Sequence, residues 1–321
     1  MTAGIGRSPA PPPDMTFTQL EIFALVAELN SFTQAGLRLG ISQSAVSHAV
    51  AALEEEWGVA LFERQRGGVS LTDIGRQLVT RSREVVGLSA TLRQEAAAAR
   101  GLKRGTLRIG SFGPTSSIRL LPALLDAYRK QYPDIDVRVD EGSDRNVRAW
   151  LLDRRIDLGF VVLPDERFDT EPIAEDQMVV LLPPGHALAE RERISLPALC
   201  AYPFIMTECG SCDLVEALFT AARLKPDTRH RSSQVLSVMA LVARGEGWSI
   251  LAELSLPPEP WSLPCVVRPL QPVARRRIGL AMLDASQASP AARAFVSLAR
   301  RLRPHLVLDP HKHRAAHANA S

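Results

Sequence analysis

Residues 31–48 read SFTQAGLRLGISQSAVSH and contain two helix starts on either side of a glycine turn. Ser31 can cap the first helix, because serine side chains accept hydrogen bonds from the free amides of a helix N-terminus. Gly40 ends that helix, since glycine readily adopts the left-handed conformation that follows a helix. Ser42 is the next cap. A short helix, a tight glycine turn and a second helix predict a helix-turn-helix.

The second helix has one apolar side and two chemically different polar ends. Its apolar residues recur at spacings of three and four, as a buried helix face requires, and Gly58 stops it. They are Ala45, Val46, Ala49, Val50, Leu53 and Trp57. The last turns present Glu54, Glu55 and Glu56. Because phosphates repel carboxylates, only the N-terminal half of this helix can enter a major groove, where a recognition helix reads bases.

Small polar side chains at the start of this helix suit base reading. Gln43 can bond to adenine through two hydrogen bonds, Ser47 to several bases, and His48 to a guanine edge or a phosphate. The next segment, residues 61–72, predicts two short strands joined by a glycine turn, a wing that places Arg64 and Arg66 at the DNA backbone or minor groove. The expected DNA contacts are Thr33, Ser42, Gln43, Ser44, Ser47, His48, Arg64 and Arg66. An ordinary helical pair with a polar face is the alternative.

The segments on either side of this block differ in character. Residues 1–14 are rich in proline and have no apolar core of a secretion signal, so we expect a tail, and Met15 is an alternative start. Thr72 can cap a long helix that runs to about Arg100 with an apolar stripe. Long striped helices usually pair with another helix. We expect residues 74–104 to form this linker helix and its hinge.

From Thr106 onward, segments typical of strands and helices alternate, which predicts an α/β domain with a mostly parallel sheet. Such folds bind ligands beyond the carboxyl ends of strands, at helix N-termini. Two loops qualify, residues 111–116 and residues 207–212. Their hydroxyl and N–H groups suit a carboxylate or another anion. Capped turns without a ligand are the alternative, and Glu208 disfavours an anion unless it turns away or meets a cation.

The block quoted first and its neighbours resemble one known family in order along about sixty residues. The matching motifs include Phe17-x-x-Leu20-x-x-Phe23, Ser31-Phe32-Thr33-x-Ala35, Ser42-Gln43-Ser44-Ala45-Val46-Ser47, Leu53-Glu54, Leu61-Phe62-Glu63-Arg64 and Leu71-Thr72-x-x-Gly75. This arrangement is similar to that of LysR-type transcriptional regulators. Two residues depart from the family pattern: Gly36, where alanine is usual, which is expected to loosen its helix, and His48, where arginine is common.

The resemblance implies a winged helix-turn-helix, a long linker helix that makes the dimer contact, and a two-lobed, periplasmic-binding-protein-like (type 2) α/β effector domain. Further markers of this domain are Leu121-Pro122, Tyr132-Pro133, Ile156-Asp157-Leu158-Gly159, Pro184-Gly185-His186 and Val242-Ala243-x-Gly245-x-Gly247. The implied divisions are a DNA-binding domain over 15–73, an effector domain over 105–303 with lobe one at 105–163 and 266–303 and lobe two at 164–265, and a tail over 304–321.

In such regulators the two loops bind a small-molecule effector between the lobes. The effector-binding residues implied here are Ser111, Phe112, Thr115, Ser116, Thr207, Cys209 and Ser211. The expected partners are double-stranded DNA with an interrupted inverted repeat, a small-molecule effector for which an anion is one suitable class, a second copy or a dimer of dimers, and RNA polymerase if the chain activates transcription.

Cys209 and Cys212 allow a different mode of control. A thiol at a helix N-terminus has a lowered pKa, and a second cysteine nearby can convert its sulfenic acid into a disulfide. The position resembles that of the reactive cysteine in peroxide-sensing LysR-type regulators, although the spacing to the second cysteine differs. A thiol-based redox sensor is therefore one alternative function.

The sequence contains no nucleophile elbow, phosphate-binding loop, dinucleotide fingerprint or zinc-ligand pattern. We expect no catalytic residues, no metal site and no cofactor, and an enzyme or solute-binding protein of the same α/β fold is the remaining alternative. No apolar run is long enough to span a membrane, and we expect a cytoplasmic protein.

Composition says little about the partner. The 38 Lys and Arg residues nearly balance the 35 Asp and Glu residues, for a net charge of +3. Only four of the basic residues are lysines, namely Lys103, Lys130, Lys225 and Lys312. Arginine suits bidentate phosphate contacts, but a coding bias explains the excess equally well. The location of charge along the chain, with the acids behind the groove-facing turns, is more informative than its sum.

Overall fold

The structure, a computed structural model, describes residues 15–65, 68–100, 103–208, 210–257 and 263–306. The expected N-terminal tail and nearly all of the expected C-terminal tail lie outside these residues. By internal contacts the chain forms two compact units, which are described separately below: an N-terminal unit, Met1–Leu92, and a C-terminal unit, Arg93–Ser321.

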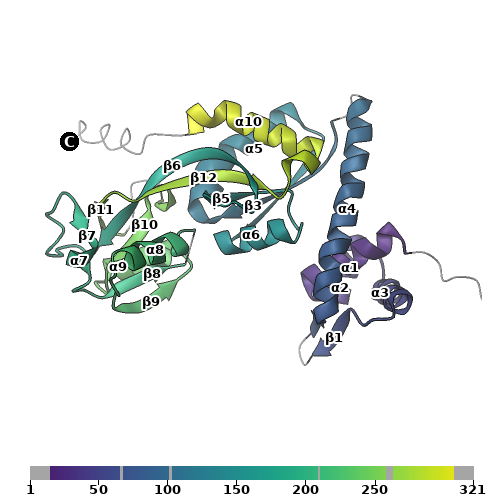
Figure 1. Ribbon diagram of the computed structural model, residues 1–321, viewed down its shortest axis with the longest axis horizontal. Helices are drawn as coiled ribbons and strands as arrows, with labels where there is room; N and C mark the ends of the chain where they lie inside the picture. The colour runs from purple at the N-terminus through teal and green to yellow at the C-terminus, as the bar shows by residue number, and fades with distance from the viewer. Residues whose placement is uncertain (1–14, 66–67, 101–102, 209, 258–262, 307–321) are drawn as a thin grey trace, which may run out of the picture. The chain divides into compact units, whose positions relative to one another are not determined.

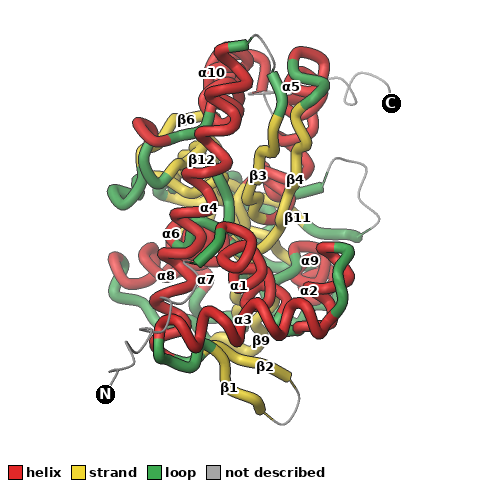
Figure 2. The backbone as a smooth tube through the Cα atoms, turned by 90° about the vertical axis from the view of Figure 1, so that its right-hand side faces the viewer, coloured by secondary structure: helices red, strands yellow, loops and turns green. Residues whose placement is uncertain are grey.

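The N-terminal unit consists of three short helices, a hairpin and most of a long helix (Figure 1). The elements are α1 (Phe17–Leu29), α2 (Phe32–Leu39), α3 (Gln43–Trp57), β1 (Phe62–Gln65), β2 (Gly68–Leu71) and α4 (Asp73–Ala99). Strands β1 and β2 pair in antiparallel fashion and form the predicted wing (Figure 2). The predicted winged helix-turn-helix is therefore confirmed.

Local hydrogen bonds fix the helix ends where the sequence predicts them. The Ser31 side chain accepts from the Gln34 amide at 3.2 Å, and the Ser42 side chain accepts from the Ala45 amide at 3.1 Å. Gly40 and Gly58 follow α2 and α3 with φ of +69° and +68°, a conformation that costs glycine little. These caps use only residues within a few positions of each helix end.

The three helices and the wing share an apolar core. Phe23 of α1 packs edge-on against Trp57 of α3 and Phe62 of β1, with ring centroids 6.2 and 5.5 Å apart. Leu53 and Val79 are buried in the same cluster, so the start of α4 belongs to this unit. Burying these rings holds the wing beside the helix-turn-helix.

The turn into α4 brings two backbone segments into close contact. Thr72 caps α4 by accepting from the Gly75 amide at 2.9 Å, and its own amide donates to the Leu61 carbonyl at 3.0 Å. A Cβ atom on Gly75 would lie 2.1 Å from that carbonyl oxygen. Only glycine fits at this position without a backbone shift.

The C-terminal unit is a two-lobed α/β structure (Figure 1). Its strands are β3 (Gly105–Phe112), β4 (Ile135–Gly142), β5 (Leu158–Leu163), β6 (Asp169–Leu182), β7 (Ile194–Ser195), β8 (Phe204–Thr207), β9 (Thr228–Ser232), β10 (Ser249–Ala252), β11 (Val266–Gln271) and β12 (Arg275–Met282). Its helices are η1 (Thr115–Leu120), α5 (Leu121–Gln131), α6 (Asp144–Leu152), α7 (Leu196–Leu199), α8 (Cys212–Ala221), α9 (Val235–Ala243), η2 (Glu253–Ser255), η3 (Ala285–Gln287) and α10 (Pro290–Leu306).

The main sheet is mixed rather than mostly parallel. Its order is β4-β3-β5-β12-β6-β11-β7, and β10 also pairs with β6. Strand β3 is parallel to β4 and β5, whereas β12 is antiparallel to both β5 and β6. The expectation of a mostly parallel sheet was wrong because strands β6, β11 and β12, which cross or return between the lobes, run against their neighbours.

Strand β6 passes from one lobe into the other. Its first part pairs with β12 in lobe one, which also contains β3, β4 and β5. Its last part, residues 178–182, pairs with β10 and β11 in lobe two, which also contains β7, β8 and β9. The expected lobe bounds at 163/164 and 265/266 differ from these pairings, because the start of β6 belongs to lobe one and β11 belongs to lobe two. Alternate side chains of residues 178–182 enter two different cores, one beneath α8 and one beneath α9. A strand covered on both faces explains this uninterrupted apolar run.

Helices cover both faces of lobe one. Figure 1 shows α5 and α10 on one face of its strands and α6 on the other. Tyr128 of α5 is fully buried, and its hydroxyl donates to the Ala291 carbonyl of α10 at 2.9 Å. Helix α6 lies on this second face with its N-terminus towards lobe two. The site described below is formed there.

The last turns of α4 belong to the C-terminal unit. The Gln94 side chain is buried, donates to the Thr106 carbonyl of β3 at 3.1 Å and accepts from the Ala291 amide of α10 at 3.3 Å. Glu95 forms an ion pair with Arg293 at 3.5 Å. A side chain of α4 thus caps α10, whose first amides have no partner within their own helix.

Candidate functional sites

The first turns of α3 carry the predicted base-reading side chains. Gln43, Ser44 and His48 are exposed, and Ser47 is half-buried. The Gln43 amide donates to the Ser47 hydroxyl at 2.7 Å, and the Ser42 and Ser44 hydroxyls lie 2.9 Å apart. These bonds join neighbours on one solvent-facing side of the helix, so the side chains can exchange them for bonds to a partner.

The acidic end of α3 has a structural role. The Glu54 carboxylate accepts hydrogen bonds from the amides of Leu61 and Phe62 at 2.7 and 3.2 Å, where the chain enters the wing. The Glu54 carboxylate therefore binds groups within the N-terminal unit. From the sequence we expected the Glu54 charge to be repelled by phosphate. Its hydrogen bonds to the start of the wing were not predicted.

The remaining predicted DNA contacts lie in the same unit. Thr33 is exposed in the first turn of α2. Arg64 stands on β1 in register with Val69 of β2, and its side chain is outside the described atoms. Arg66 lies outside the described residues. The structure also gives Gly36 a packing role rather than a loosening one, because a Cβ atom there would lie 2.8 Å from the Ile41 carbonyl oxygen of the turn.

The first predicted effector loop follows β3 and enters a wide helical turn, η1, which begins before the predicted helix start. Ser111, Phe112, Thr115 and Ser116 are all buried. Ser116 accepts from the Phe112 amide and donates to the Phe112 carbonyl, both at 2.8 Å, and it also accepts from the Ser111 hydroxyl at 2.9 Å. Of the hydroxyl groups that we expected to face a ligand, those of Ser111 and Ser116 are thus bonded within the loop, and that of Thr115 accepts from Arg276 of β12.

The second predicted loop joins β8 to α8. Thr207 and Ser211 are buried, and Cys209 lies outside the described residues. Gly210 has φ of +61°, and a Cβ atom on it would lie 2.6 Å from the Phe112 ring of the first loop. The two loops therefore lie close together.

A buried arginine that the sequence analysis missed binds both loops. Arg276 of β12 donates to Asp176 of β6 from Nε and Nη2 at 2.8 and 2.7 Å. Its other bonds reach Thr115 Oγ1 at 2.9 Å, Ser211 Oγ at 2.9 Å and the Gly210 carbonyl at 3.2 Å. All five guanidinium N–H groups thus have partners. Arg276 and Asp176 side chains are each 1 % exposed, so the pair joins the two loops out of contact with water.

A signal for this residue was present in the sequence. Arg276 shares the parity of Ile278 and Leu280 along β12, and alternate residues of a strand face the same side. Its neighbours Arg275 and Arg277 are exposed. An arginine in phase with apolar residues indicates a buried, paired charge.

The environment of Cys212 contradicts the expected thiol chemistry. Cys212 begins α8, as predicted, but burial and then the nearby Glu216 carboxylate raise the pKa of its thiol to about 11. The sulfur lies 3.6 Å from the Glu216 carboxylate, to which it donates. Our expectation of a lowered pKa was wrong because desolvation and this carboxylate outweigh the helix dipole.

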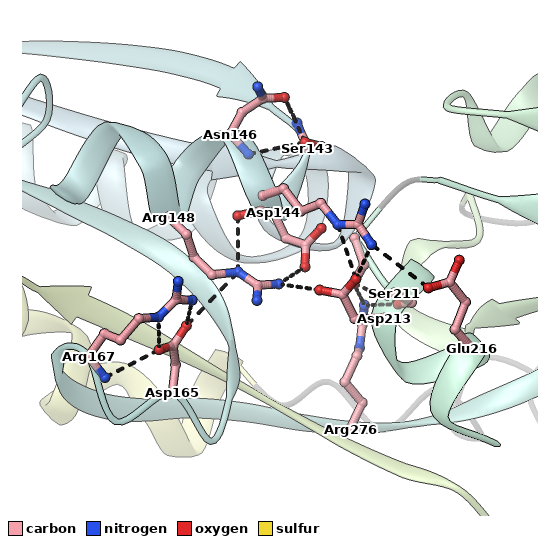
Figure 3. Close-up of polar contacts among 12 residues, drawn as sticks. Ser143, Asp144, Asn146, Arg148, Asp165, Arg167, Ser211, Asp213, Glu216 and Arg276 are labelled. Atoms are coloured by element: carbon pink, nitrogen blue, oxygen red, sulfur yellow. Dashed lines mark hydrogen bonds and ion pairs between the residues drawn. The ribbon is translucent and has the colours of Figure 1, made fainter. Parts of the chain in front are cut away.

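Charged residues around the two loops are largely matched. Glu208 forms an ion pair with Arg231 at 3.8 Å, so the carboxylate that disfavoured an anion has a cationic neighbour. Where α6 faces α8, Arg145 and Arg148 contact Asp213 (Figure 3). None of these three residues stands out in the sequence, because their proximity arises only from the folding of two lobes.

Across the part of the chain that the structure describes, no group of three or more His, Cys, Asp or Glu side chains is arranged to hold a metal ion. Within the same residues, no helix combines the length and apolar character needed to cross a membrane.

A winged helix-turn-helix joined through a long helix to a two-lobed α/β unit defines a class of ligand-controlled transcriptional regulators. Two family models match the chain: the bacterial regulatory helix-turn-helix protein of the lysR family over residues 17–76, and the LysR substrate binding domain over residues 100–303. The chain therefore belongs to the LysR family. It is a LysR-type transcriptional regulator with an effector-binding domain, and the family consists of regulators rather than enzymes.

Similar proteins support this assignment along nearly the whole chain. The HTH-type transcriptional regulator YvbU of Bacillus subtilis is 35% identical over 90% of this chain and 99% of its own length. A full-length OxyR variant of Pseudomonas aeruginosa is 25% identical with a TM-score of 0.71, covering 92% of this chain and 96% of its own. Full-length CbnR complexed with its target DNA is 25% identical with a TM-score of 0.50, covering 90% of this chain and 100% of its own.

Proposed function

We propose that the first two turns of α3 read bases in the major groove of an interrupted inverted repeat. The main support for this proposal is that the polar side chains of Gln43, Ser44 and His48 are exposed. Glu54, later in the same helix, is bonded to the wing. Arg64 and Arg66 supply backbone contacts from the wing, Thr33 lies in the first turn of α2, and Ser42 caps α3. Such contacts give affinity, whereas the α3 side chains give sequence preference.

The regulator acts as a dimer or a dimer of dimers, paired through the apolar stripe of α4. Val85, Leu88 and Leu92 on that helix are exposed within the single chain, with Leu92 at 66 %. Two copies present two α3 helices, which suits a repeated half-site. We infer that the protein works in the cytoplasm, where promoter DNA is available, and that an activating member contacts RNA polymerase.

The effector is a small molecule that binds between the lobes, at the loops that contain Ser111, Phe112, Thr115 and Ser116 and Thr207, Cys209 and Ser211. The support is their convergence around Arg276, which joins residues of both loops. Because the Ser111 and Ser116 hydroxyls are bonded to one another and those of Thr115 and Ser211 to Arg276, effector binding requires exchange of existing bonds. Binding that changes these bonds favours one arrangement of the lobes over another.

Footprinting with the full-length protein on its own promoter region tests the DNA-binding proposal. We expect protection of an inverted repeat that weakens as salt rises, because phosphate contacts release counterions. Gln43→Ala should relax the base preference, whereas a substitution of the exposed Gln77 on α4 should leave it unchanged. The absence of a protected repeat would count against the proposal. So would the same base preference in the Gln43→Ala and Gln77 variants.

Thiol-based redox sensing is the second candidate. The similarity to OxyR and the place of Cys212 at the start of α8 favour it, but the raised pKa of the Cys212 thiol opposes it. Peroxide treatment followed by mass spectrometry tests this candidate. A Cys209–Cys212 disulfide would support it, and unmodified thiols at peroxide concentrations that cells encounter would exclude it.

A further inference from the structure

Helix α6 of lobe one and helix α8 of lobe two meet through one shared carboxylate (Figure 3). Arg145 of α6 donates to Asp213 Oδ1 from Nε at 3.1 Å and also from Nη2. Arg148, one turn further along α6, donates to Asp213 Oδ2 at 3.3 Å. Both oxygens of a single lobe-two carboxylate are therefore held by two arginines of lobe one.

The lobe-one half of this contact is built in advance. Arg148 is bonded to the Asp144 carboxylate, and its Nε lies 4.0 Å from Asp165, which is itself bonded to Arg167 at 2.6 Å. The side chains of Asp144 and Asp165 are 4 % and 6 % exposed, and that of Arg148 is 18 % exposed. Buried carboxylates fix the direction of the Arg148 guanidinium whether or not Asp213 is present.

The lobe-two half is weakly held by comparison. Asp213 is 45 % exposed and its lobe-one partner Arg145 is 63 % exposed, so water reaches the pair. Glu216, the other nearby carboxylate of α8, lies 3.9 Å from Arg145. Exposed ion pairs change an equilibrium constant by only about two- to fivefold. A carboxylate from solution can therefore compete with Asp213 for the two arginines.

The neighbouring Arg276 cannot take this role. Its guanidinium bonds to Ser211, which is close to Asp213 in the sequence. However, all of its N–H groups are bonded within the chain, and it is almost inaccessible to water. A ligand arriving between the lobes therefore meets the exposed Arg145 and the partly exposed Arg148, and not the buried arginine that joins the loops.

We propose that Arg145 and Arg148 form a carboxylate-binding site between the lobes, which Asp213 occupies in the ligand-free chain and from which a carboxylate group of the effector displaces it. The inference rests on the proposed function, since it assumes that the effector binds between the lobes. Displacement releases α8 from α6. Loss of this tie lets lobe two move relative to lobe one, which is the change that an effector must cause.

Chemical rescue in the full-length protein tests the site. We expect Asp213→Ala to speed amide hydrogen exchange in peptides covering α6 and α8 by about threefold, in line with the loss of an exposed ion-pair tie. Sodium formate at about 0.1 M should restore the slower exchange of the α6 peptide, where it binds the two arginines, but not that of the α8 peptide, which it cannot join to α6. Sodium chloride at the same ionic strength should restore neither, because both salts screen charge equally. Asp213→Asn repeats the test with a side chain of the same shape.

Two controls separate this site from general salt effects. Asp136→Ala removes an exposed carboxylate that pairs with Arg138 on β4, away from both helices, and formate should leave its exchange unchanged. Adding Arg145→Ala and Arg148→Ala to the Asp213→Ala chain should abolish the rescue. Unchanged exchange in Asp213→Ala, rescue by chloride, or rescue without the arginines would each overturn the proposal.

The promoter footprint keeps this proposal distinct from the proposed function. A protein that protects its promoter repeat but shows no formate rescue would reject the carboxylate site alone. A protein that shows rescue but protects no repeat would reject the DNA-binding proposal and leave the site standing.

Discussion

The first turns of α3 and the loops around Arg276 carry the same kinds of side chain in opposite states. Gln43 and Ser44 are exposed on the surface of the N-terminal unit. Ser111, Thr115 and Ser211 are buried in the C-terminal unit and hydrogen-bonded there. One set of polar groups can bind a partner as it stands, whereas the other must first give up bonds within the chain.

The two states arise from different ranges of interaction. Caps such as Ser42 bond to residues three positions away, so the presentation of α3 depends on local sequence. Arg276 bonds to Thr115, which is 161 positions away, and to Ser211, which is 65 positions away. A surface built locally can stay open, whereas a junction built from distant segments is stable only when its buried polar groups are paired.

The largest expected effect comes from breaking the buried junction. Arg276→Met leaves the Asp176 carboxylate buried without its partner, which should lower the free energy of unfolding of the C-terminal unit by about 3–5 kcal/mol. Urea unfolding followed by circular dichroism measures the loss. Arg275→Met is the matched control, because Arg275 pairs with Glu175 in an exposed position. Equal stability of the two variants would show that the junction does not hold the loops.

Two glycines of α4 test the local contacts that hold the N-terminal unit together. Gly75→Ala should destabilise the N-terminal unit by about 1–3 kcal/mol, because the new methyl group meets the Leu61 carbonyl. Gly87→Ala, on the same helix with nothing near its Cβ position, should instead stabilise by up to about 1 kcal/mol. Thermal unfolding of both variants checks the opposite signs. The same sign in both would contradict the close approach at Gly75.

Removing one exposed amide should change recognition without changing stability. Gln43→Ala is expected to weaken binding to the preferred base sequence by about 1–3 kcal/mol, as for other two-bond base contacts. Stability should stay within about 0.5 kcal/mol, because the site is on the surface. Titration of promoter fragments by fluorescence anisotropy measures the first value and thermal unfolding the second. A large loss of stability would show that Gln43 has a structural role, like the buried polar residues around Arg276.

The smallest expected signal is the labelling of Cys212. With a pKa raised to about 11, its thiol is almost fully protonated at neutral pH, and only the thiolate reacts. Alkylation by iodoacetamide should be roughly a hundredfold slower than for free cysteine, and its rate should rise about tenfold per pH unit up to about pH 10. Mass spectrometry of the peptide that contains Cys212 measures the rate. Rapid labelling at pH 7 would revive the redox alternative.

Sequence alone predicted most of the N-terminal unit because its determinants are close together. The caps at Ser31, Ser42 and Thr72 and the helix stops at Gly40 and Gly58 are signals within a few residues of the ends they specify. The wing followed from a glycine turn between two apolar pairs. These features need no knowledge of distant contacts.

The C-terminal unit was only partly predicted. Alternating strands and helices from Thr106 onward were predicted, but the first part of β6, from Asp169, alternates with polar residues, and its antiparallel pairing with β12 could not be predicted. The loops were found from their place after strands, yet their burial was not. Arg276, Asp176 and Asp213 gain their roles from partners in other lobes or strands, and no local pattern identifies those partners.

The contact of Gln94 with two elements of the C-terminal unit determines where that unit can be cut. A fragment beginning at Gly105 would keep every strand but lose the side chain that serves the Thr106 carbonyl and the Ala291 amide. Each buried group left without a partner costs about 1–3 kcal/mol. A soluble, well-folded fragment for ligand screening should therefore start upstream of Gln94, within helix α4, and carry those last turns as part of its own core.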